Sequence, residues 1–245
     1  MRIKLIIAYD GTDYCGWQVQ NNGKSIQRAV QDAIEDLYGH EVMLTGASRT
    51  DSGVHALHQV AVFDTDKDIG IRKLPMALNV RLPEDIRIRG AEIVAGDFHP
   101  RYCDTVKTYE YRILNTDFPD PTKRLYSTFV HPKLSRESMR RALKYIEGRH
   151  DFICFCASGS NVEGSTERTI TKAELLEDGD MITIRISGDG FLHNMVRIIA
   201  GTVIKIGLNA WPPEYIKAII DSKDRRNAGP TAPAEGLTLT DIIYL

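Results

Sequence analysis

The sequence predicts an α+β protein made of two halves. Stretches that alternate between apolar and polar residues indicate strands, and apolar residues spaced three and four apart indicate helices. These patterns give the order strand–helix–strand–strand–helix–strand in the first half and a looser version of it in the second. The chain has 245 residues, 42% of them apolar, which is enough for one globular domain or two of about 120 residues.

The first half begins with a strand at 2–9, which ends at the turn pair Asp10-Gly11. Ser25 can cap a helix that ends at Gly39. The apolar residues of this helix form one face and comprise Ile26, Ala29, Val30, Ala33, Ile34 and Leu37. The remaining elements follow as a strand at 42–48, a strand at 58–65, a short helix at 71–79 and a strand at 87–95.

The second half repeats this order without similarity between individual residues. Its expected elements are a strand at 107–114, a helix after Ser135, strands at 168–177 and 181–188, helices at 190–207 and 212–221, and a strand at 239–245. Two stretches rich in Gly, Ser or Pro, 157–166 and 222–236, are expected to be loose. We place the boundary near 98–106, so the two halves are 1–103 and 104–245. The order βαββαβ is that of the ferredoxin-like unit.

Composition excludes several classes of protein. The net charge of −2 argues against a generic nucleic-acid coat, so any RNA binding must depend on local basic patches. The four cysteines form no CxxC pair, which favours free thiols in a reducing cytoplasm over a zinc site. The longest apolar stretch, 191–208, includes His193, Arg197 and Lys205, and the N-terminal apolar run is too short for a signal peptide. We therefore expect a cytoplasmic protein without a membrane span.

The stretch from Arg49 to Ala56 carries the strongest chemical signal. It reads Arg-Thr-Asp-Ser-Gly-Val-His-Ala, and it lies between two expected strands. Gly53 suits the positive φ of a sharp turn, so Asp51 should lie on a tight connection at a strand end. Taken alone, an aspartate before a glycine can equally be an ordinary Asx-turn residue.

The wording of this stretch resembles the active-site motif of the bacterial tRNA pseudouridine synthase A family. Four further blocks resemble that family in the same order: Tyr9-Asp10-Gly11 with Gly16-Trp17-Gln18, Phe98 to Tyr102 with Lys107 to Arg112, Gly190 to Arg197, and Ala232 to Leu237. Each block is modestly specific, whereas five in the right order are highly specific. Pro100 and Tyr102 depart from the family pattern without removing a chemical group.

The resemblance implies a pseudouridine synthase fold in which the sheets of two ferredoxin-like halves meet at an active-site cleft. It implies isomerisation of uridine to pseudouridine at positions 38, 39 and 40 of the tRNA anticodon stem-loop by a homodimer. Asp51 would be the nucleophile, Arg197 its charge partner, and Tyr109 the residue in contact with the target base. No cofactor is implied, because the reaction has no net redox change and the leaving group is retained.

The residues themselves leave two roles open for Asp51. An ionised carboxylate can attack C1′ or C6 as a nucleophile, or it can remove a ribose proton as a base. Arg197 lies on a largely apolar helix, where a partly buried guanidinium favours a carboxylate partner, although a side chain reaching water is the alternative. Tyr109 can stack under a flipped uracil or simply pack in the sheet. Arg49 can fill the place that a flipped uridine leaves, or remain solvated.

Other functions remain possible at this point. His55 and His58 with Asp51 could suggest a metal hydrolase, but Gly53 interrupts any shared helical face and no further ligand stands near, so no metal is expected. An RNA-binding module without catalysis and a pseudouridine synthase for other RNA sites are the remaining rivals. Basic residues on the expected helix at 135–147, with only Glu137 and Glu147 opposing them, could contact RNA: Arg136, Arg140, Arg141 and Lys144.

Overall fold

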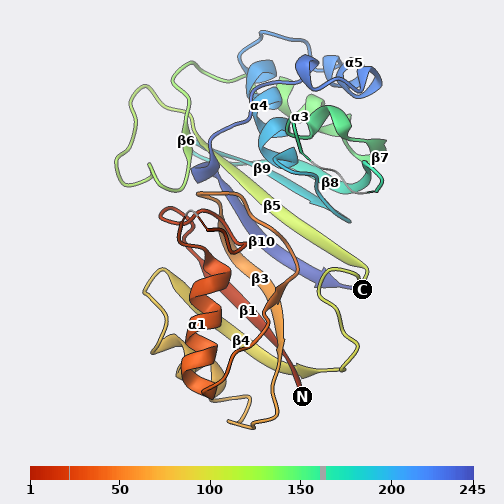
Figure 1. Ribbon diagram of the computed structural model, residues 1–245. Coiled ribbons are helices and arrows are strands. Elements are labelled where there is room, and N and C mark those ends of the chain that lie inside the picture. The colour runs from red at the N-terminus through yellow and green to blue at the C-terminus, as the bar shows by residue number, and fades with distance from the viewer. Residues whose placement is uncertain (22, 161–163) are drawn as a thin grey trace. The chain divides into compact units, whose positions relative to one another are not determined.

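The computed structural model describes residues 1–21, 23–160 and 164–245 (Figure 1). It forms two compact units. Unit 1 consists of Met1–Asp104 with Thr238–Leu245, and unit 2 of Thr105–Leu237. The predicted second half, 104–245, includes the C-terminal strand, which the structure assigns to unit 1. The expected loose stretch 157–166 falls partly outside the described residues.

Unit 1 is a mixed sheet with two helices. Its elements are β1 (Arg2–Tyr9), α1 (Ile26–Tyr38), β2 (Thr45–Gly46), β3 (His55–Asp64), α2 (Leu74–Asn79), β4 (Ile86–Val94) and β10 (Leu237–Tyr244). Strand β1 lies between β4 and β3, antiparallel to both, and the short β2 is antiparallel to β3. Strand β10 is parallel to β3 through Thr238 opposite His55. The predicted order βαββαβ is therefore confirmed for residues 2–94.

Helix α1 forms where its sequence predicts it. The Ser25 hydroxyl accepts a hydrogen bond from Arg28 N, and the backbone N–H of Gly39 donates to Glu35 O, so both ends are capped. The buried face packs on the sheet, with the Tyr38 ring 5.7 Å from the Phe63 ring of β3. Each large apolar side chain buried in this way contributes about 1.5–3 kcal/mol.

The predicted strand at 42–48 was wrong in extent, since only Thr45–Gly46 pairs with β3. Side chains of α1 bind the backbone before it: Gln27 Nε2 donates to Leu44 O at 2.7 Å, and Gln31 Nε2 donates to Val42 O at 3.0 Å. These carbonyl groups are satisfied by the helix and need no strand partner. The predicted helix at 71–79 is also shorter, because Pro75 lacks an N–H and fits only the first turn.

Unit 2 contains antiparallel and parallel strand pairs together with three α-helices. Its strands are β5 (Thr105–Leu114), β6 (Thr128–Phe129), β7 (Gly148–Asp151), β8 (Glu167–Asp178) and β9 (Met181–Gly188), and its helices are α3 (Arg136–Lys144), α4 (Met195–Gly207) and α5 (Tyr215–Ser222). Short 3-10 turns lie at Ile153–Phe155, Arg225–Asn227 and Ala234–Gly236. The antiparallel order is β5-β9-β8-β7, and β6 is parallel to β5. The long strands were predicted, whereas the short β6 and β7 were missed.

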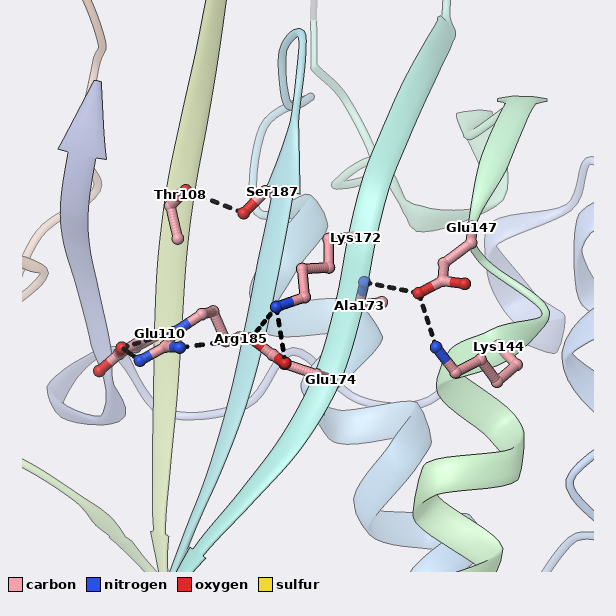
Figure 2. A network of polar contacts seen from close by, with 9 residues as sticks. All are labelled: Thr108, Glu110, Lys144, Glu147, Lys172, Ala173, Glu174, Arg185 and Ser187. Carbon is pink, nitrogen blue, oxygen red and sulfur yellow. Dashed lines mark hydrogen bonds and ion pairs between the residues drawn. The ribbon is translucent and has the colours of Figure 1, made fainter. Parts of the chain in front are cut away.

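The two faces of the unit 2 sheet differ in character. Ile182, Ile184 and Ile186 of β9 are fully buried. The opposite face carries a charged network, in which Arg185 Nη2 donates to Glu110 at 2.7 Å and Arg185 Nη1 to Glu174 at 3.2 Å (Figure 2). These residues are direct cross-strand neighbours in the register. The Glu110 carboxylate raises the pKa of Arg185, and the ion pairs join the three neighbouring strands.

Asp151, at the end of β7, joins three segments of unit 2. Its carboxylate accepts hydrogen bonds from the Thr166 hydroxyl at 2.5 Å and from Ile153 N at 3.1 Å, and it lies 3.1 Å from Lys223 Nζ. The Thr166 hydroxyl, followed by Lys223 and Ile153 N, lowers the pKa of Asp151 below its ordinary value of 3.8, against the effect of burial. The contribution to stability is therefore present at neutral pH and is lost as the pH falls through the lowered value.

We expect Asp151→Asn to lower the free energy of unfolding by about 1 kcal/mol at neutral pH, because a charge-assisted interaction is lost. The difference from wild type should shrink as the pH falls below 3.8 and through the lowered pKa of the folded protein, because the wild-type carboxylate is then protonated as well. Urea unfolding of variant and wild type, at neutral pH and below pH 3.8, measures this difference in the free energy of unfolding. Asp178→Asn, at an exposed carboxylate at the end of β8, is the control. A loss of equal size at both pH values would contradict the expectation.

Candidate active site

Asp51 lies on the connection between β2 and β3, as the sequence predicts. Ser52 and Gly53 form a turn that is closed by a hydrogen bond from Val54 N to Asp51 O at 3.1 Å. Gly53 has φ of 77°, the positive value that the turn requires. The Asp51 side chain is half-buried. The expected tight turn at a strand end is confirmed.

The segment after β1 fixes the backbone on both sides of Asp51. Trp17 N donates to Thr50 O at 3.1 Å, while Gly53 N donates to Tyr14 O at 3.3 Å. A Cβ at Gly16 would lie 2.4 Å from Thr50 O, so only glycine permits this close approach. The family block that includes Gly16 and Trp17 thus holds the turn that carries Asp51.

Buried side chains support the same turn from below. The hydroxyls of Tyr9 and Thr50 share a hydrogen bond of 2.8 Å, and Gly11 N donates to Nδ1 of the buried His55 at 3.1 Å. The Tyr14 hydroxyl donates to Asp85 at 2.8 Å. Burial and this hydrogen bond raise the pKa of Tyr14, so its hydroxyl stays a donor at neutral pH. A carboxylate on such a preorganised turn can be held in one orientation toward a substrate.

Three other residues singled out in the sequence, Arg49, His55 and His58, lie in the same unit. Arg49 is exposed, two residues before Asp51 on the same connection. His55 and His58 have different surroundings, because His58 Nδ1 lies 3.1 Å from Asp241 of β10. Within the described residues no three His, Cys, Asp or Glu side chains gather as metal ligands would.

Tyr109 lies on β5 in unit 2. Its side chain is 6% exposed, and the edge of its ring meets the Phe191 ring at 5.1 Å and 80°. Phe191 belongs to the segment before α4, so the family block with Lys107 to Arg112 contacts the block from Gly190 to Arg197 here. The contact fixes the plane of the Tyr109 ring.

Tyr111 has the same orientation on β5 and is fully buried. Its hydroxyl contacts Thr128 Oγ1 at 2.5 Å and donates to Pro233 O at 2.9 Å, and burial raises its pKa. Sequence reasoning missed this role, although Pro233 is part of the C-terminal family block. Tyr111 therefore ties β5 to the segment that carries that block.

We expect Gly236→Ala to destabilise the protein by about 1–3 kcal/mol, since it overfills a packed site. A Cβ at Gly236 would lie 2.7 Å from Cζ of Tyr111 and 3.0 Å from Arg112 O. Urea unfolding of wild type and variant measures the difference. Gly96→Ala is the control, because its Cβ would meet nothing within 4 Å. Equal stability of the Gly236 variant and wild type would contradict the packing described.

Arg197 lies in the first turn of α4 and is half-buried. Its Nε donates to Ala232 O at 2.8 Å, and its Nη1 donates to Asn194 Oδ1 at 2.8 Å. The helix begins at Met195 and not directly after Gly190, because Asn194 takes the left-handed conformation with φ of 60°. The guanidinium is thus oriented by its own unit.

The predicted loose stretch 222–236 was wrong for its second part. Gly229 N donates to the Thr202 hydroxyl at 2.9 Å, and Ala232 N donates to Arg197 O at 3.1 Å. This backbone runs along α4, and a Cβ at Gly201 would lie 1.9 Å from Pro230 O. Small residues on the helix therefore allow a tight contact that composition alone could not reveal.

The predicted basic patch on α3 also needs correction. Its cations face more carboxylates than Glu137 and Glu147: Arg136 lies 2.5 Å from Glu177, Arg140 also pairs with Glu177, and Arg141 lies 3.8 Å from Glu214. Lys144 lies 3.0 Å from Glu147. Glu177 comes from β8 and Glu214 from the segment before α5, so tertiary contacts largely neutralise this surface.

Comparisons with known proteins identify the family. The profile of the tRNA pseudouridine synthase family matches residues 5–103 and 142–245. The tRNA pseudouridine synthase A 2 of Clostridium perfringens (strain 13 / Type A) is 48% identical over 242 residues, which is 99% of each chain. The tRNA pseudouridine synthase A of Acetivibrio thermocellus is also 48% identical, and that of Thermoanaerobacter sp. (strain X514) is 47% identical, each with 99% of both chains covered.

These relatives bear the name of a class of RNA-modifying isomerases, and the mixed α/β fold is consistent with that class. The chain belongs to the tRNA pseudouridine synthase family. The expected family and enzyme class are thereby confirmed. None of the helices in the described parts of the chain has the length and apolarity needed to cross a membrane.

Proposed function

We propose that the chain isomerises uridine to pseudouridine at positions 38, 39 and 40 of the tRNA anticodon stem-loop. The observation that carries this proposal is the half-buried Asp51 on a turn that is hydrogen-bonded on both flanks. The bond from ribose C1′ to N1 breaks, the base rotates, and C5 bonds to C1′ while the C5 proton is lost and N1 gains one. Substrate and product are isomers, so the reaction needs neither oxidant nor reductant.

Asp51 supplies the carboxylate in this proposal. It acts either as a nucleophile at C1′ or C6 or as a base toward the ribose, and both roles require the ionised form. Arg197 is the cation that orients Asp51 and stabilises its charge. Its fixed guanidinium, bound to Ala232 O and Asn194 Oδ1, supports that role because little ordering remains to be done on substrate binding.

Tyr109 contacts the target base and exchanges a proton near C5. The edge contact with Phe191 supports this role, since it holds a flat ring in one plane. The uridine leaves the base stack to reach the site, and Arg49 takes its place there. The exposure of Arg49, two residues from Asp51, supports that assignment.

The finer architecture is proposed as well. We infer that residues 1–103 and 104–245 are two ferredoxin-like halves whose sheets line the active-site cleft. Support comes from the antiparallel order β4-β1-β3-β2 in unit 1 and from β5-β9-β8, with α3 between β5 and β8, in unit 2. The family resemblance further supports a homodimer that binds tRNA in the cytoplasm without a cofactor or metal.

The experiment that tests the function is a mass-spectrometric assay for pseudouridine in tRNA transcripts treated with the purified protein. Transcripts that retain a single uridine at position 38, 39 or 40 should each gain one pseudouridine. Transcripts with cytidine at all three positions should gain none. Modification at another site would indicate a pseudouridine synthase of different specificity, and binding without modification would indicate an RNA-binding module.

A further inference from the structure

Arg101 of unit 1 feels the positive charge of Arg49 and has no Asp or Glu partner among the described residues. The pKa of Arg101 is lowered, first by partial burial of the guanidinium and second by the positive charge of Arg49. The residue as a whole is exposed. Neither arginine forms an ion pair with Asp or Glu in the described parts of the chain. The α3 cations differ, since carboxylates of β8 and of the segment before α5 face them. A guanidinium without an acidic partner favours the binding of an anion.

Arg101 lies beside the strand that leads to Asp51. Its Nη2 donates to Gly46 O of β2 at 3.5 Å, a weak contact that leaves most of its donors available. Gly46 precedes the connection that carries both Arg49 and Asp51. An anion held by Arg101 would therefore lie on the side of unit 1 where this connection begins.

A stacked pair of aromatic rings, His99 and Tyr102, adjoins Arg101. The Tyr102 side chain is 82% exposed, and its ring stacks on the His99 ring at 4.2 Å and 23°. His99 Nδ1 accepts a hydrogen bond from Arg101 N at 3.2 Å, and Tyr102 N donates to His99 O at 3.3 Å. The imidazole covers one face of the phenol ring, and the high exposure leaves its other face to solvent. A ring held in this way can stack against a base.

The segment 98–102 carries these side chains. It is held by contacts with β1 and with β10, the strand at the C-terminal end of the chain (Figure 1). Arg2 Nη1 donates to Phe98 O at 2.9 Å, and the Tyr244 hydroxyl donates to Pro100 O at 3.0 Å. The Phe98 and Tyr244 rings pack at 5.0 Å. An ordered segment loses less conformational entropy on binding than a mobile loop does.

We propose that this segment forms a nucleotide-binding site for the substrate RNA. Arg101 holds a backbone phosphate, and the His99–Tyr102 pair stacks one base beside it. The proposal rests on the proposed function, because it takes tRNA as the ligand. Arg101 and Tyr102 are positioning residues in it: they hold the RNA on unit 1 and take no part in bond making.

The test measures the affinity of the whole protein for a tRNA transcript across a series of salt concentrations. Arg101→Ala should reduce the slope of log affinity against log salt by about 1, because one phosphate contact is lost. Tyr102→Ala should weaken binding by about fivefold or more with an unchanged slope, since stacking is not ionic. Tyr102→Phe should bind as wild type does. In turnover, both alanine variants should raise KM and leave kcat nearly unchanged.

Two control variants remove the same kinds of side chain, an arginine and an exposed aromatic ring, outside the proposed site. Arg140→Ala removes a cation that is already paired with Glu177, so the salt slope should not change. Phe118→Ala removes an aromatic side chain that is 81% exposed in unit 2, and it should leave affinity unchanged. Thermal unfolding of every variant separates a binding effect from a folding effect. Arg101→Lys is added as a further variant, and it should keep the wild-type salt slope because it keeps the positive charge.

The outcomes distinguish this inference from the proposed function. Pseudouridine formation by wild type, with unaltered slope in Arg101→Ala and unaltered affinity in Tyr102→Ala, would overturn the nucleotide site alone. Binding effects as expected, with no pseudouridine formed by wild type, would overturn the proposed function and support the site. Equal losses in the Arg140 and Arg101 variants would also overturn the site, because binding would then follow net charge and not position.

Discussion

Asp51→Asn is expected to abolish pseudouridine formation, with a loss of at least 10²- to 10⁴-fold as an order of magnitude for a catalytic group. The amide keeps the shape of the carboxylate but can neither attack as an anion nor accept a ribose proton. Folding should be preserved, because backbone groups hold the turn through Trp17 N, Thr50 O and Val54 N. Asparagine also suits a turn position.

Single-turnover assays with excess enzyme measure the Asp51 effect apart from product release. Asp13→Asn, at an exposed carboxylate in the segment that supports the turn, is the matched control and should keep wild-type turnover. Affinity for tRNA and the free energy of unfolding should change little in either variant. Turnover near the wild-type level in Asp51→Asn would remove this residue from the mechanism.

Arg197→Leu should have the second largest effect, because it affects both stability and turnover. The leucine removes two hydrogen bonds of a charged donor and leaves Ala232 O without the Nε–H, at a cost of about 1.5–3 kcal/mol each before solvent compensates. In the proposed mechanism it also removes the cation that orients Asp51. Turnover should therefore fall further than the stability loss can explain.

Comparison with Arg197→Lys separates these two contributions. Lysine keeps the charge but lacks the planar fork, so it should recover part of the turnover and little of the hydrogen bonding. Lys205→Ala, at an exposed position of the same helix, is the control for changes in α4 itself. Urea unfolding and turnover are measured on all variants under conditions where each is folded. An Arg197→Leu protein as stable and active as wild type would contradict both roles.

Most of the regular fold was predictable because local signals and burial agree. Ser25 and Gly39 cap the two ends of α1, as the sequence predicts. The alternating residues of 2–9 and 181–188 form β1 and β9. The turn at Asp51 was predictable for the same reason, since Gly53 encodes it locally, whereas the resemblance to the family motif singled out Asp51 as the candidate nucleophile. The family blocks identified Tyr109 and Arg197, but no periodicity could reveal that Phe191 contacts Tyr109 or that Ala232 binds Arg197.

The sequence alone therefore determined the elements whose conformation depends on neighbours along the chain, together with the family and the turn that carries Asp51. Tertiary structure decided what depends on partners far away in sequence. Side chains of α1 satisfy the backbone at 42–44 and shorten β2, and Glu177 and Glu214 neutralise the cations of α3. Strand β10 pairs with β3 through Thr238 and His55, which lie far apart in the sequence. A hydrogen bond or ion pair of this kind depends on spatial proximity, which no local pattern of residue types encodes.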